Sequence, residues 1–176
     1  MAIEQDKTLE ALQFAIRMEI DGKEYYLTIS EETSTAAGKS LLQSLAAAED
    51  FHRQKFVEIY EVLRGRQSWP VIILQSPSAG ELRTVFSRAA EELSSNVKPL
   101  ATELVAIEKA MEMENRSYDY YKSQETEAEH DVERDFYKNL AAEERVHQLA
   151  LLDYYEYLKD PAGWFVRTEH PSLDGG

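Results

Sequence analysis

The stretch LAAAEDFH at residues 45–52 decides the fold of this chain, because it returns as LAAEERVH at residues 140–147. Each copy ends in a glutamate followed three residues later by a histidine: Glu49 and His52, then Glu144 and His147. Residues three apart lie on one face of an α-helix, so each step presents a carboxylate and an imidazole to a single point. The pattern predicts two helices that each supply a metal-binding pair.

The repeat extends outward from these two stretches at a constant offset of 95 residues. It superposes Glu19 on Glu114, each of which lies 30 residues before the glutamate of its own E-x-x-H step. Between 11–65 and 106–160, 15 of the 55 aligned positions are identical without a gap, which indicates duplication of a helical hairpin. Two E-x-x-H helices and one glutamate from each of two others form the ligand set of a carboxylate-bridged di-metal centre.

Four segments show the apolar periodicity of amphipathic helices, and none reads as a strand ladder. Their predicted ranges are 8–32, 37–64, 99–125 and 131–159. The links within each hairpin are short, whereas residues 66–98 form a long crossover between the hairpins. The crossover opens with an apolar stretch at 69–74, and a capping box at 78–81 predicts a short helix to about residue 94. This connectivity predicts an all-α, ferritin-like four-helix bundle.

Length and composition limit the number of domains, the kinds of partner and the kinds of chemistry that this chain can have. Residues 1–160 are expected to form one bundle domain, and residues 161–176 a tail whose Trp164 and Phe165 dock on it. The net charge of −14 argues against nucleic acid as a partner. No apolar run reaches the roughly 18 residues of a membrane span, and the N-terminus does not read as a signal peptide, so a cytoplasmic location is expected. The absence of cysteine excludes thiolate chemistry and cysteine-ligated metals.

Helix geometry predicts that the six candidate ligands meet. Glu19 lies about as far before the predicted turn at 33–36 as Glu49 lies after it, so both reach the same depth in an antiparallel hairpin. Glu114 and Glu144 flank the second turn in the same way. Buried carboxylates at one level are costly unless they bind protons, cations or metals. Two divalent ions would balance four negative charges, and oxygen ligands with one imidazole per metal favour Fe or Mn over zinc.

In each repeat, one tyrosine lies seven residues after the first glutamate. These residues, Tyr26 and Tyr121, lie two helical turns along the same face as Glu19 and Glu114. We interpret them as inward-facing groups that hydrogen-bond a ligand carboxylate or a bound oxygen species. The alternative is that they only fill the core of the bundle.

These residues resemble the rubrerythrin group of the ferritin-like superfamily over about residues 8–160. The resemblance implies a non-haem di-iron site with two Fe ions per chain, although Mn or a mixed pair would suit the same ligands. It implies that Glu49 and Glu144 bridge the metals. The remaining ligands would be Glu19 and His52 for one metal, and Glu114 and His147 for the other.

The chain departs from the rubrerythrin pattern in two ways. Full rubrerythrins carry a cysteine-ligated rubredoxin domain, which these residues lack, so electrons are expected from an external protein such as a rubredoxin. Rubrerythrins also place an extra glutamate three residues after the third-helix ligand, where this chain has Ser117 and, in the first repeat, Gly22. The ligand set is therefore equally that of a bacterioferritin-type ferroxidase centre.

The resemblance implies an oxidoreductase of oxidative-stress defence that reduces hydrogen peroxide, or activates dioxygen, with electrons from that donor. The alternative is a ferroxidase or iron-handling protein, for which Fe(II) is a substrate. A metal-free structural bundle would leave the six matched ligands unexplained. Rubrerythrin-like chains commonly pair through apolar elements such as the crossover and the tail, so a homodimer is expected. Neither nucleic acid nor membrane is expected as a partner.

Overall fold

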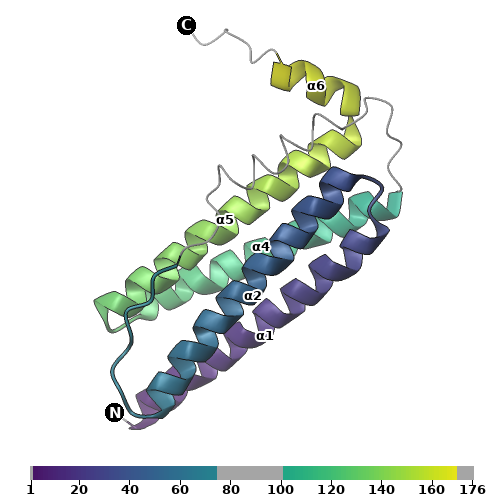
Figure 1. Cartoon of the computed structure of the whole chain (residues 1–176). Coiled ribbons are helices and arrows are strands. Elements are labelled where there is room, and N and C mark those ends of the chain that lie inside the picture. The colour runs from purple at the N-terminus through teal and green to yellow at the C-terminus, as the bar shows by residue number, and fades with distance from the viewer. Residues whose placement is uncertain (1, 75–100, 170–176) are drawn as a thin grey trace, which may run out of the picture.

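Four long helices lie side by side in the computed structural model, which describes residues 2–74 and 101–169 (Figure 1). They are α1 (Ala2–Glu32), α2 (Ala36–Arg64), α4 (Ala101–Glu127) and α5 (Asp131–Lys159). A short helix, α6 (Pro161–Glu169), follows α5 at one end of the bundle. The described residues contain no strand, which confirms the predicted all-α bundle.

The predicted helix ends agree with the structure within two residues, except at the N-terminus. There α1 begins at Ala2 and not at Thr8, so the first helix is longer than predicted. The predicted start of the third helix at Pro99 and the predicted crossover helix at 78–94 lie outside the described residues.

The tail folds into a helix that the sequence pattern did not predict. Pro161 occupies the first helical position, where a missing N–H leaves no bond unmade. The backbone N–H of Trp164 donates to the carbonyl of Asp160, closing the first turn at 2.9 Å. Trp164 is buried and packs edge-on against Tyr157 of α5, with ring centroids 5.7 Å apart. Trp164 of the tail therefore packs against α5, whereas the side chain of Phe165 lies outside the described residues.

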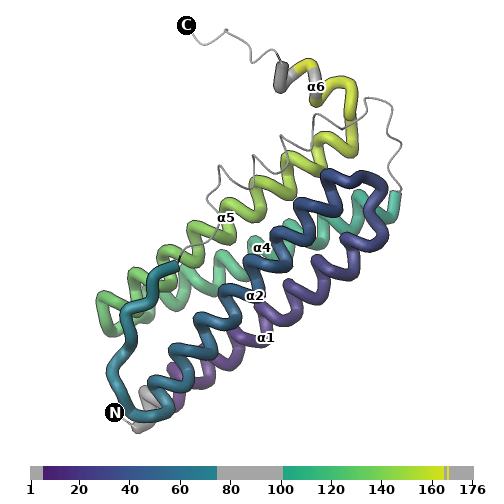
Figure 2. The backbone as a smooth tube through the Cα atoms, viewed as in Figure 1, coloured from purple at the N-terminus to yellow at the C-terminus, as the bar shows by residue number. Residues whose placement is uncertain are grey.

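The bundle consists of two helical hairpins joined across their faces. The closest packing is of α1 on α2 and of α4 on α5, and the tube in Figure 2 follows each pair around its turn. Tyr25 donates from its hydroxyl to the carbonyl of Ala106 at 3.0 Å, and Tyr120 donates to the carbonyl of Ala11 at 2.9 Å. These two bonds are related by the 95-residue offset. The duplicated hairpins are therefore packed with approximate twofold symmetry.

The hydrophobic core has two parts. One contains residues such as Tyr26, Leu45, Ala110 and Tyr154, and the other residues such as Leu12, Phe56, Tyr121 and Leu140. On each of the four long helices, the candidate ligands lie in sequence between residues of the first part and residues of the second. The polar centre is therefore enclosed by apolar packing on both sides along the bundle.

The turn between α1 and α2 is held by a carboxylate from α4. Glu103 accepts hydrogen bonds from the hydroxyl of Thr33, from the backbone N–H and hydroxyl of Ser34 at 3.1 and 2.7 Å, and from Tyr154 at 2.7 Å. Burial would raise the pKa of Glu103, but these bonds outweigh it and lower that pKa. A Cβ at Gly38 would clash with the hydroxyl of Tyr154, so a larger residue there would displace Tyr154 from this network.

The chain that follows α2 crosses the end of the bundle toward α5 (Figure 1). Trp69 is buried there against Phe136 and Tyr137, with ring centroids 6.2 and 6.0 Å apart. Val71 and Ile73 are 79% and 71% exposed, so this segment is apolar on a side that the described bundle does not cover.

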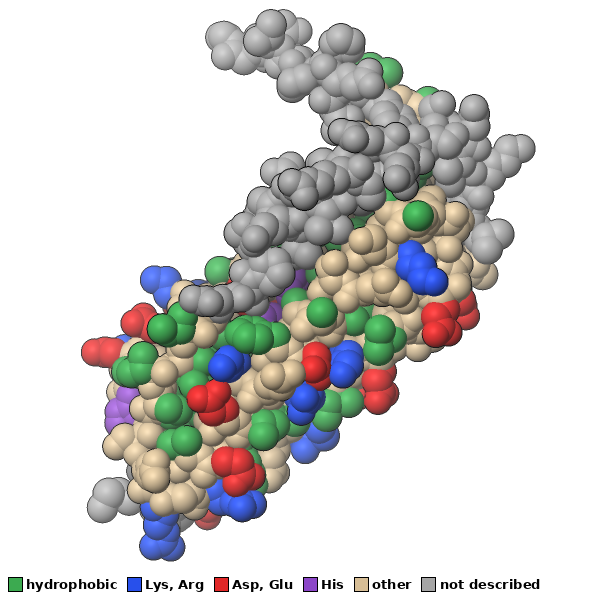
Figure 3. Space-filling model, in the orientation of Figure 1, with side chains coloured by type: hydrophobic (Ala, Val, Ile, Leu, Met, Phe, Trp, Pro, Cys, Tyr) green, Lys and Arg blue, Asp and Glu red, His purple; other side chains and the backbone are tan. Residues whose placement is uncertain are grey.

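The outer surface carries charges of both signs. On the face in Figure 3, basic and acidic side chains alternate with apolar ones along the helices. Within residues 2–74 and 101–169, no helix is both long and apolar enough to cross a membrane.

Candidate metal centre

The six candidate ligands meet in one buried cluster between the two parts of the core. Each of these six residues is at most 4% exposed. They come from all four long helices: Glu19 from α1, Glu49 and His52 from α2, Glu114 from α4, and Glu144 and His147 from α5. The equal spacing of the ligands from the two hairpin turns accounts for this common depth.

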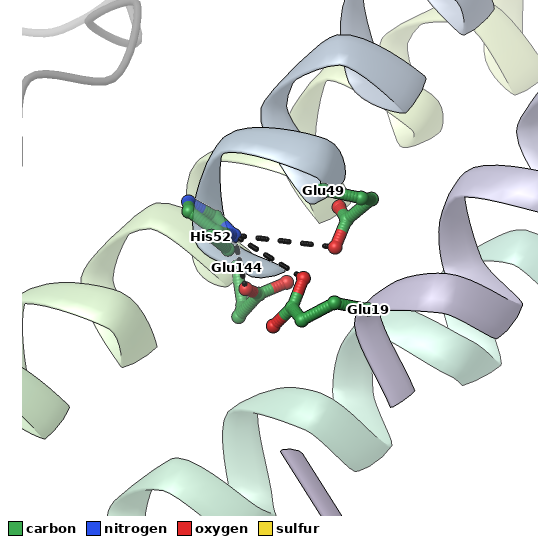
Figure 4. Close-up of side chains that lie close together, drawn as sticks. All are labelled: Glu19, Glu49, His52 and Glu144. Carbon is green, nitrogen blue, oxygen red and sulfur yellow. Dashed lines mark ion pairs between the residues drawn. The ribbon is translucent and has the colours of Figure 1, made fainter. Parts of the chain in front are cut away.

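One half of the cluster is arranged around His52 (Figure 4). Its Nδ1 lies 3.5 Å from Glu19 Oε2, 3.4 Å from Glu144 Oε1 and 4.0 Å from Glu49 Oε2. Ligand atoms of these four side chains lie within 4.8 Å of one another, a spacing that suits a single metal ion.

The other half is arranged around His147 in the same way. Its Nδ1 lies 3.2 Å from Glu49 Oε1, 3.6 Å from Glu114 Oε2 and 3.6 Å from Glu144 Oε2. The imidazole rings of His147 and His52 are stacked with centroids 5.6 Å apart. Glu49 and Glu144 belong to both groups, whereas each remaining ligand belongs to one. The geometry thus offers two adjacent metal positions that share two carboxylates.

The hydrogen bonding of the polar atoms at the centre of the cluster indicates whether metal ions would fit there. Several of them make no hydrogen bond to the described residues: Glu19 Oε2, Glu49 Oε1, Glu114 Oε2, both carboxylate oxygens of Glu144, and Nδ1 of His147. Within the described part of the chain, the four carboxylates pair with the two histidines and with no lysine or arginine. Buried groups of this kind are costly without a partner, and two divalent cations would satisfy them together. The residues therefore fit a di-metal site.

The ionisation of the metal-free cluster reflects its crowding. Burial, reinforced by repulsion from Glu49, raises the pKa of Glu19 well above its usual range. Burial and repulsion from Glu144 raise the pKa of Glu114 to about 8. Burial would lower the pKa of His147, but the carboxylates of Glu114, Glu144 and Glu49 together outweigh it and raise that pKa. Without metal, the cluster therefore retains protons that bound cations would displace.

Tyr26 and Tyr121 hydrogen-bond candidate ligands in a crossed arrangement. Tyr26 of α1 donates to Oε1 of Glu114 on α4, and Tyr121 of α4 donates to Oε1 of Glu19 on α1. Burial and the nearby carboxylates raise the pKa of both phenols, so both stay protonated as donors. Each tyrosine thus orients the glutamate of the other repeat, leaving the second oxygen of that glutamate directed at a histidine.

The structure adds one residue that sequence reasoning missed. Glu143 of α5 places Oε2 2.6 Å from Nε2 of His52, on the side of the ring opposite the cluster. At the 95-residue offset its counterpart is Ala48. This is one of three positions at which the stretches 45–52 and 140–147 differ, and it was the available signal.

Ser117 and Gly22 stand at matching positions three residues after Glu114 and Glu19. A Cβ at Gly22 would lie 3.4 Å from Cγ of Glu49. Position 22 is therefore close to this glutamate, but glycine has no side chain that could contact it. Ser117 lines a cavity of about 500 Å³ between α1 and α4, together with Met18 and Met113. These two methionines each directly precede a candidate ligand.

A four-helix bundle with two buried carboxylate–histidine groups defines the class of ferritin-like proteins with a candidate di-metal site. The family model described as Rubrerythrin matches residues 10–155, most of the chain. The chain therefore belongs to the rubrerythrin family, whose members are non-haem di-iron proteins. No curated protein and no solved structure matched it.

Proposed function

We propose that this protein is a di-iron oxidoreductase that reduces hydrogen peroxide, or activates dioxygen, with electrons from an external donor. The observation that carries the proposal is the pair of buried four-residue groups that share Glu49 and Glu144. A bound pair of iron ions supplies the Lewis acidity and the electrons for cleavage of an O–O bond. For peroxide the balanced change is H2O2 + 2H+ + 2e− → 2H2O.

The side chains of this chain then have separate roles. Glu19, Glu114, His52 and His147 would each hold one metal, and the two shared glutamates would hold both. Tyr26 and Tyr121 keep the outer glutamates oriented through their hydrogen bonds. The two apolar layers of the core limit the access of water to the centre. The cavity beside Ser117 is lined by Met18 and Met113, the residues directly before Glu19 and Glu114, and by none of the six candidate ligands.

Electrons for turnover would come from another protein. These 176 residues contain no cysteine and so cannot form a rubredoxin-type iron site of their own. A small iron protein such as a rubredoxin is the donor that membership of the rubrerythrin family favours.

A second candidate is ferroxidase or iron-handling activity, in which Fe(II) is the substrate. One observation favours it: the two groups are equivalent in composition, each with one outer glutamate, one histidine and two shared glutamates. Ser117 stands where the rubrerythrin pattern would add a further carboxylate to one of them. A symmetric set of this kind is also the ligand set of bacterioferritin-type centres.

Retention of iron distinguishes the two activities. Protein loaded anaerobically with Fe(II) and treated with hydrogen peroxide should consume it and still hold about two irons per chain after desalting. Release of the iron, or its growth into a mineral over repeated additions, would instead support the ferroxidase. The exposed-site variant Glu112→Ala is the matched control and should behave like the parent protein. A loaded protein that reacts with neither peroxide nor dioxygen would contradict both activities.

We further propose that the chain forms a homodimer through the segment after α2. Trp69 anchors this segment, and the side chains of Val71 and Ile73 are largely exposed. Large exposed apolar side chains close together are typical of association surfaces. Light scattering should give the mass of two chains, and the double variant Val71→Ser, Ile73→Ser should shift it toward one. A monomer at all concentrations, or a large cage, would refute the proposal.

A further inference from the structure

The imidazole of His52 is held from both sides. Its Nδ1 faces Glu19 and Glu144 in the cluster, while its Nε2 lies 2.6 Å from Oε2 of Glu143. A neutral imidazole that offers the Nδ1 lone pair to a metal carries its proton on Nε2, and that proton needs an acceptor. The carboxylate of Glu143 is placed to accept it.

The second imidazole has a different neighbour in sequence. Glu143 directly precedes Glu144, and the residue that directly precedes the matching Glu49 is Ala48. An alanine side chain has no atom that accepts a hydrogen bond. The duplication that makes the six ligands equivalent therefore does not extend to the carboxylate beside His52.

We propose that Glu143 is a positioning residue that fixes the Nε2–H tautomer of His52 and makes the two metal positions of this chain unequal. The inference rests on the proposed metal-binding function of the cluster. A carboxylate hydrogen-bonded to a metal-binding histidine makes the ring a stronger donor and restricts its rotation. The position at His52 therefore binds its ion more tightly than the position at His147.

Calorimetry tests whether the two metal positions differ in affinity. Fe(II) is added to metal-free protein under anaerobic conditions, and the heat of binding is measured. The parent protein should bind two ions in separate steps of different affinity. Glu143→Ala should weaken the tighter step about 10- to 100-fold, which brings the two steps closer together. Glu156→Ala removes the same charge from an exposed position on the same helix and should leave both affinities unchanged.

A spectroscopic measurement distinguishes the effect of the hydrogen bond between His52 and Glu143 from the effect of the negative charge of Glu143. In protein loaded with diamagnetic Zn(II), the Nε2–H proton of His52 should give a low-field resonance that exchanges slowly with water. Glu143→Ala should abolish this signal. Glu143→Gln keeps an acceptor oxygen at nearly the same place, so it should retain the signal while weakening the tighter step less than Glu143→Ala does. Because Glu143→Gln is nearly isosteric, it decides the matter if the alanine variant does not fold.

The outcomes separate this inference from the proposed function. If the parent binds two ions and both Glu143 variants bind them with unchanged affinity, Glu143 has no positioning role and the metal site stands. If the parent protein itself binds no metal, the proposed function fails. A loss of affinity confined to the looser step would also overturn the assignment, because Glu143 contacts His52.

Discussion

Glu144→Ala should eliminate binding at both metal positions, because this side chain contributes one oxygen to each of them. Its Oε1 lies 3.4 Å from Nδ1 of His52, and its Oε2 lies 3.6 Å from Nδ1 of His147. Loss of this shared carboxylate would leave each of the two candidate positions with one ligand fewer. Elemental analysis after anaerobic loading and desalting should fall from about two irons per chain to nearly none.

Glu114→Ala is the informative comparison for this variant. Glu114 belongs only to the group around His147, so its removal should cost one ion and leave the group around His52 intact. Far-UV circular dichroism checks that both variants stay helical. Retention of two irons by Glu144→Ala would contradict the shared role, and equal losses in the two variants would contradict the division into two groups.

Removal of metal should destabilise the bundle strongly at alkaline pH and much less at mildly acidic pH. The folded-state pKa of Glu114 is raised from 4.5 to about 8, so the folded metal-free protein holds a proton there that the unfolded chain has lost. The contribution of Glu114 to the free energy of unfolding of the metal-free protein therefore falls as the pH rises from 4.5 through about 8. The shift corresponds to an effect on the order of 5 kcal/mol.

The histidines act in the same direction. Their pKa values are raised above 6.5, so their contribution is complete below that pH and is lost as the pH rises through their folded-state values. Asp50, Glu103 and Glu144 have lowered pKa values and act in the opposite direction, but only below their ordinary values of 3.8 for the aspartate and 4.5 for the glutamates. Between about pH 5 and pH 9 the trend of metal-free stability should therefore be downward.

Thermal unfolding of chelator-treated and metal-loaded protein measures the effect. The difference in Tm should be large near pH 8 and should narrow toward pH 5, because bound cations replace the protons that neutralise the cluster. Glu114→Gln removes one charge at nearly constant shape, so it should raise the Tm of the metal-free form at pH 8 while lowering metal affinity. A Tm that chelation leaves unchanged at pH 8 would count against a metal site in this cluster.

Helical periodicity and the internal duplication were enough to find the cluster from the sequence. An α-helix fixes which residues share a face and how far each lies from a turn, so Glu19, Glu49 and His52 were placed at one depth by spacing alone. The same offset then gave the second set of residues. Absence of cysteine excluded thiolate ligands. All of these are local properties of the chain.

Contacts between hairpins were decided only by the tertiary structure. The hydrogen bond from Tyr26 to Glu114, the one from His52 to Glu143 and those from the first turn to Glu103 each join residues more than 65 positions apart. Such contacts depend on which helices are neighbours and on the rotamers that packing allows, and periodicity along one helix carries neither. The sequence therefore determined the six candidate ligands, whereas the packing of the hairpins decided which groups lie against them, including the carboxylate of Glu143 beside His52.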